Sequence, residues 1–134
     1  MSGRACLVLV VVVLACAGCG TTEKSTTELI SDLKGGEERD RVIAVRSLSN
    51  DQGEAARVVP ALIEALKDKE SDIRWSAAIK LGTFGEQARD ALPALQAALS
   101  DRDARVREAA GKAMSRIDPA KYPTPPRGSK PKGK

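Results

Sequence analysis

Apolar residues recur in steps of three and four along residues 28–117, and short polar or glycine-containing stretches separate these segments. This spacing predicts amphipathic helices that each bury one face. The helical pattern also repeats after about 33 residues, without a gap. The matching sets are Leu33, Arg41 and Ala44; Leu66, Arg74 and Ala77; and Leu99, Arg107 and Ala110. A fixed period of this length is typical of a solenoid, so we predict an all-α fold, a short α-solenoid of about three helical pairs.

Each unit is expected to contain two helices, and the three units cover about residues 28–50, 54–84 and 87–117. Pro60 and Pro93 occupy matched positions in the first helices of units two and three. Such a proline either bends a helix or starts it at the first turn. Gly82 and Gly85 are predicted to break the chain after the middle unit.

Composition and charge remove several classes of function. The chain has no histidine, and its three cysteines all lie within the first 19 residues. No Ser-His or Cys-His pair, glycine-rich phosphate loop or metal-spaced carboxylate cluster is present, so we expect no enzyme, no cofactor and no metal. Residues 20–118 contain 16 Lys and Arg against 18 Asp and Glu. The basic excess belongs to the C-terminal tail, and we therefore expect no nucleic-acid partner.

The first 20 residues have the pattern of an export signal. A positive start, ending at Arg4, precedes 13 uncharged residues, 5–17. A membrane-spanning helix needs about 20 apolar residues, so a signal segment over residues 1–18 fits better. Ala17-Gly18-Cys19 resembles the lipobox of bacterial lipoproteins, in which the cysteine is acylated and becomes the new N-terminus. Cys19 is the preferred attachment site, and Cys16 is the alternative. In the motif that ends at Cys19, Cys16 stands where the family prefers leucine.

This resemblance implies a location in the cell envelope, on the extracytoplasmic side of a membrane. Two or more acyl chains attach a protein stably, whereas one alone is marginal. Gly20 is not the aspartate that favours inner-membrane retention, so the outer membrane is favoured. An ordinary cleaved signal or an uncleaved anchor is the alternative. Residues 19–27 are expected to form a polar linker.

Residues 118–134 are rich in Pro, Gly and Lys, and from residue 119 onward they contain no Asp or Glu. Such a composition predicts a disordered basic tail. The tail either keeps the protein soluble or contacts anionic lipid, a polyanion or the cell wall.

Units two and three share one pattern of residue types, Asp68-x-x-x-x-Ile73-Arg74-x-x-Ala77 and Asp101-x-x-x-x-Val106-Arg107-x-x-Ala110. This pattern resembles the HEAT-like repeats first described in phycobilisome lyase subunits. Ankyrin and tetratricopeptide arrays have a similar period, but their signature motifs are missing. Unit one departs from the pattern, because Gly35 replaces the aspartate and Asp40 the branched apolar residue.

The resemblance implies that Asp68, Arg74, Asp101 and Arg107 form a hydrogen-bonded ladder between stacked units, with a structural role. Arrays of this kind need roughly three units to bury a continuous core. With one atypical unit, we expect marginal stability as a monomer and stabilisation by a partner or by self-association.

The second helices of a solenoid line its concave face, where partners usually dock. Trp75 and Ile79 are outward-tending positions there, as are Arg46 and Lys112, and these four are the candidate partner-binding residues. Trp75, the only tryptophan, is either an exposed anchor for a partner or packed against a neighbouring unit. We expect a membrane-anchored, non-catalytic adaptor or scaffold that binds a protein. The alternative is a structural envelope component whose tail contacts lipid or cell wall.

Overall fold

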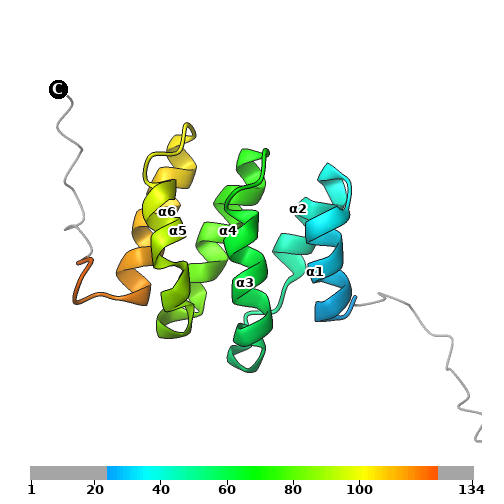
Figure 1. Cartoon of the computed structure of the whole chain (residues 1–134), viewed down its shortest axis with the longest axis horizontal. Coiled ribbons are helices and arrows are strands. Elements are labelled where there is room, and N and C mark those ends of the chain that lie inside the picture. Colours follow the sequence, from blue (N-terminus) through cyan, green and yellow to red (C-terminus); the bar gives the residue numbers. More distant parts are fainter. Residues whose placement is uncertain (1–23, 124–134) are drawn as a thin grey trace, which may run out of the picture.

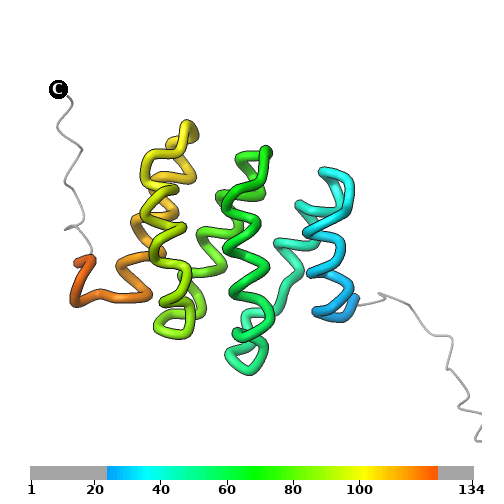
Figure 2. Tube along the Cα trace, viewed as in Figure 1, coloured from blue at the N-terminus to red at the C-terminus, as the bar shows by residue number. Residues whose placement is uncertain are grey.

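A computed structural model describes residues 24–123 of the chain. Cys16 and Cys19, the predicted signal segment and tail residues 124–134 lie outside the described residues. Three helical pairs stand side by side along the long axis (Figure 1), and the Cα trace in Figure 2 follows the same order. The α-helices are α1 (Thr26–Gly35), α2 (Glu38–Ser47), α3 (Ala55–Ala65), α4 (Ser71–Thr83), α5 (Leu92–Ala98) and α6 (Ala104–Ile117). Short 3₁₀ helices, η1 (Gln52–Glu54) and η2 (Gly85–Ala91), connect the pairs. The fold is a short α-solenoid.

The core lies between two layers of helices. Contacts run from α1 to α3 in one layer, and from α2 to α4 to α6 in the other. Aliphatic side chains fill the space between the layers, and Leu62, Leu81 and Leu95 are completely buried. Ala44, Ala77 and Ala110 recur at the same position of each second helix and are also completely buried. Small residues at this position let helices approach closely, as in other densely packed interiors.

The two matched prolines have different local effects. Pro60 lies inside α3, where it removes one helical hydrogen bond. Pro93 lies in the first turn of α5, where its missing N–H has no helical partner to lose. The 3₁₀ helix η2 occupies the part of unit three that corresponds to η1 and the start of α3 in unit two.

Of the two glycines expected to break the chain, only Gly85 does so. Gly85 has a φ of 55°, a left-handed conformation that glycine adopts easily, and it follows the end of α4. The prediction for Gly82 was wrong, because this residue lies inside α4. A Cβ on Gly82 would lie 3.0 Å from the Cα of Ala113 in α6. Gly82 therefore permits the close approach of α4 and α6.

Both boundaries of the repeat region extend further than expected. Ser25 caps α1 in a reciprocal capping box with Glu28, so α1 begins within the predicted linker. At the other end, a turn in residues 118–123 follows α6, within the stretch for which a disordered tail was predicted. The N–H of Tyr122 donates to the carbonyl of Asp118 at 2.9 Å, and the Tyr122 ring packs against the core.

Candidate functional site

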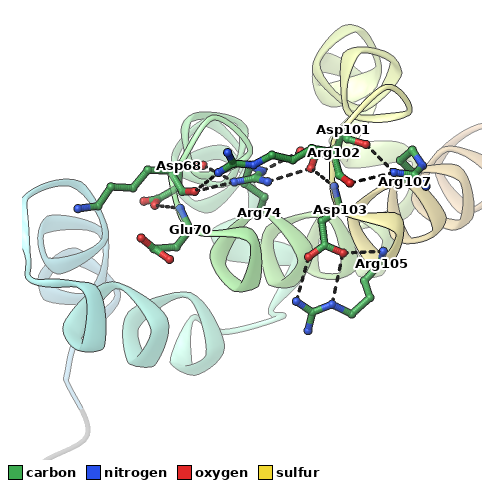
Figure 3. A network of polar contacts seen from close by, with 9 residues as sticks. Asp68, Glu70, Arg74, Asp101, Arg102, Asp103, Arg105 and Arg107 are labelled. Atoms are coloured by element: carbon green, nitrogen blue, oxygen red, sulfur yellow. Dashed lines mark hydrogen bonds and ion pairs between the residues drawn. The ribbon is translucent and has the colours of Figure 1, made fainter.

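Two arginine–aspartate pairs connect the three units (Figure 3 shows the second). Arg74 donates from Nε to Oδ2 of Asp101 at 2.7 Å and from Nη2 to Oδ1 at 2.8 Å. One unit earlier, Arg41 donates from Nε and Nη2 to Asp68 at 2.9 and 3.3 Å. These bidentate contacts are charge-assisted and fix both partners in orientation. We call each such pair a rung.

Each rung also organises the turn between the two helices of a unit. The Nη1 atom of Arg74 donates to the carbonyls of Asp68 and Lys69 at 2.9 Å each. On the other side of the rung, Oδ1 of Asp101 accepts from the N–H of Asp103 at 2.9 Å. The arginine thus joins the turn of its own unit to the turn of the next.

The electrostatics follow from this geometry. The hydrogen bond from Arg74 lowers the pKa of Asp101, and the same contact raises the pKa of the Arg74 guanidinium. The side chains of Arg74 and Asp101 are 7% and 11% exposed. A pair this shielded from water is strongly coupled, and neither member can be removed without leaving a buried charge.

The predicted ladder residues do not all occupy rungs. Asp68, Arg74 and Asp101 do, whereas Arg107 in the last unit donates from Nη1 only to the carbonyls of Asp101 and Arg102. Sequence reasoning missed Arg41 as a ladder residue. The signal was present, because Arg41 is one period before Arg74. The partner of Arg41 is Asp68 of unit two, so the aspartate missing from unit one does not affect this pair.

A groove of about 400 Å³ lies between α4 and α6. Trp75 and Ile79 line it from α4, and the Trp75 indole is half-buried and packs against the core. Lys112, from α6, donates to Glu108 at 2.6 Å across one helical turn. The groove brings together three of the four candidate partner-binding residues, Trp75, Ile79 and Lys112. Its complete lining is Trp75, Ile79, Gly82, Arg105, Glu108, Ala109, Lys112, Ala113 and Arg116.

The fourth candidate, Arg46, is exposed on α2 and does not line the groove. Sequence reasoning also missed Arg105, which lines the groove and lies 2.9 Å from Asp72 and 3.0 Å from Asp103. Hydrogen bonds from Arg105 lower the pKa of Asp103 to about 2. Three basic side chains and one acidic side chain line the groove. Arg105 is paired with Asp72 and Asp103, and Lys112 with Glu108, so the margin of the groove is polar with its charges largely balanced.

Lys80 makes a further contact between units. Its ammonium group donates to the carbonyl of Leu48 at the end of α2, and burial lowers the pKa of Lys80. The carbonyl belongs to a helix end, where backbone acceptors lack helical partners. Lys80 thus helps to hold unit two against unit one.

The described residues contain neither a metal-binding group nor a membrane-spanning helix. Across residues 24–123, no group of three or more His, Cys, Asp or Glu side chains is arranged to hold a metal ion. Within the same range, no helix has the length and apolar character needed to cross a membrane. An aromatic side chain beside a groove with polar margins is an arrangement that suits recognition of another protein.

Comparison with curated proteins finds no match. Comparison with protein families finds one described as HEAT repeats, whose model matches residues 26–115, well over half of the chain. HEAT repeats generally mediate protein–protein interaction and are typically non-catalytic. The match begins at the start of α1, ends two residues before the end of α6 and includes both rungs. The chain belongs to the HEAT-repeat family.

Proposed function

We propose that this protein is a lipid-anchored, non-catalytic scaffold of the bacterial cell envelope, which binds a partner protein in the groove between α4 and α6. The groove is the observation that carries the binding function. Ile79 is 39% exposed although it is a large apolar residue, and it lies in the groove beside Trp75. Aromatic anchors surrounded by a polar margin dominate the binding energy of many interfaces.

The anchor rests on the sequence alone. The predicted export signal ends at Gly18, directly before Cys19, and acylation of Cys19 would hold the repeats on the extracytoplasmic side, with the outer membrane favoured. Residues 20–24 would then be a very short link between the lipid and α1, because an extended chain spans at most about 3.6 Å per residue. Such a link would keep unit one close to the membrane surface.

Photo-crosslinking in cells tests the binding function. A benzoylphenylalanine is placed at Ile79 or at Lys112, with Gln96 as the control, because Gln96 is exposed on α5 in the other helical layer. We expect both groove positions to crosslink to the same protein, and Gln96 to give no such product. Equal products at all three positions, or none at the groove, would refute the proposed binding surface.

Cysteine variants test the anchor. Cys19→Ser should abolish labelling by a radioactive fatty acid and release the protein from the membrane fraction, whereas Cys16→Ser should leave both unchanged. If Cys16→Ser abolishes labelling and Cys19→Ser does not, the attachment site is the alternative one. If neither variant is labelled differently from the natural chain, the protein is not anchored in this way.

A further inference from the structure

The ladder is incomplete at the C-terminal end of the solenoid. Arg41, Arg74 and Arg107 all donate from Nη1 to the carbonyls of their own turn. Arg41 and Arg74 also donate from Nε and Nη2 to an aspartate of the following unit. Among residues 24–123, Nε and Nη2 of Arg107 have no hydrogen-bond partner. The guanidinium is therefore held in the orientation that makes a rung, but without a carboxylate.

An apolar residue at the same end lacks the cover that its equivalents have. Leu99 is 41% exposed, whereas Leu33 and Leu66, at the same position of units that are followed by another, are 5% and 7% exposed. The turn of residues 118–123 follows α6 at this end (Figure 1), and it leaves both Leu99 and Arg107 exposed. Leu99 and Arg107 are thus equivalent to the leucine and the arginine through which units one and two contact the unit that follows them.

We propose that this terminal surface, formed by Leu99 and Arg107, docks a helical unit of another protein that presents an aspartate to Arg107 and apolar side chains to Leu99. At both internal contacts the same arginine meets an aspartate in bidentate geometry, and the same leucine is buried in the hydrophobic core. This surface is separate from the groove between α4 and α6, so the proposal goes beyond the proposed function.

A second copy of the chain does not fit as the occupant. Stacked in the same register, it would place Gly35 opposite Arg107, where Asp68 and Asp101 stand at the internal contacts. Its first unit also carries Ile43, which is 53% exposed, at the position that Ser76 and Ala109 occupy as small buried residues. Two copies meeting by their C-terminal ends would instead bring Arg107 against Arg107. Residues 119–134 contain no Asp or Glu, so they cannot supply the carboxylate from a side chain.

The chain itself can be converted into a probe. Gly35→Asp restores the carboxylate, and a Cβ on Gly35 would meet no heavy atom within 4 Å. Ile43→Ala restores a small residue, and Leu99→Lys blocks the probe's own terminal surface. This triple variant is labelled with a fluorophore, and its binding to the unlabelled natural chain is measured by sedimentation velocity. Both chains are full length, in a density-matched detergent.

We expect a 1:1 complex between the probe and the natural chain, and no self-association of either alone. Arg107→Ala in the natural chain should weaken the complex roughly tenfold or more, since it removes charge-assisted hydrogen bonds. Leu99→Ala should weaken it also, and it serves as the second variant if Arg107→Ala fails to fold. The matched control is Arg89→Ala, which changes an exposed arginine of η2 that lies outside both the groove and the terminal surface, and it should leave the affinity unchanged.

Two results would overturn the inference. One is that the probe does not bind, or binds Arg107→Ala and Leu99→Ala as well as the natural chain. The other is that the natural chain associates with itself through Arg107, which would make the occupant a second copy. Neither result bears on the groove, whose crosslinks at Ile79 are measured separately.

Discussion

Replacing Arg74 by methionine should destabilise the protein severely. The substitution keeps an unbranched side chain of similar length but removes the bidentate contact to Asp101 at 2.7 and 2.8 Å and two hydrogen bonds to backbone carbonyls. Asp101 is only 11% exposed, so its carboxylate would remain largely shielded from water without a partner. Breaking a buried pair in this way costs about 3–5 kcal/mol. Since small domains have about 5–15 kcal/mol of stability in total, much of the margin would be lost.

The matched control is the same change at an exposed ion pair. Lys112 and Glu108 are 65% and 68% exposed, and such pairs contribute about 0–1 kcal/mol. Urea unfolding followed by circular dichroism gives the free energy of unfolding of natural chain, Arg74→Met and Lys112→Met. We expect a loss of about 3 kcal/mol or more for Arg74→Met and less than about 1 kcal/mol for Lys112→Met. If the two losses are equal, the rung does not hold the units together.

Three further predictions concern packing and pH. Gly82→Ala should destabilise the protein by up to about 2 kcal/mol in urea unfolding, because overpacking against the Ala113 backbone costs about 1–3 kcal/mol and the gain in helix propensity offsets about 1 kcal/mol of this cost; a stabilised variant would contradict this. Leu62→Ala should cost about 2–5 kcal/mol in the same assay, and a loss below 1 kcal/mol would mean that α3 is not part of the core. The lowered pKa of Asp101 stabilises the fold above the unfolded pKa of about 3.9, and this contribution is lost as the pH falls through the folded pKa. The free energy of unfolding should therefore fall less steeply with decreasing pH in Arg74→Met than in the natural chain. Parallel curves for the two proteins would refute the coupling between Arg74 and Asp101.

The helical pairs could be predicted from the sequence because their signals are local and repeated. Apolar spacing identifies each helix without knowledge of its neighbours. The period of about 33 residues then assigns equivalent positions, so Ala44, Ala77 and Ala110 could be expected to share one environment, and all three are completely buried.

The features that the sequence did not reveal depend on contacts between units. Glycine is typical of a chain break, so the sequence alone suggested that role for Gly82. Only the packing of α4 against α6 shows that Gly82 is a contact residue. Trp75 packs against the core and also lines the groove, an outcome between the two alternatives that periodicity left open. The start of α1 is different, because its signal is local: Ser25 and Glu28 have the spacing of a capping box.

Hydrogen exchange measured residue by residue in the natural chain and in Arg74→Met tests most directly whether the three pairs stabilise one another as a stack. In a solenoid, stability combines the intrinsic stability of each unit with that of its contacts to neighbours. The account predicts the slowest exchange in α4, which contacts both α2 and α6, and faster exchange throughout α5 and α6 when Arg74 is replaced. Increased exchange confined to the turn around Arg74, with α6 unchanged, would contradict it.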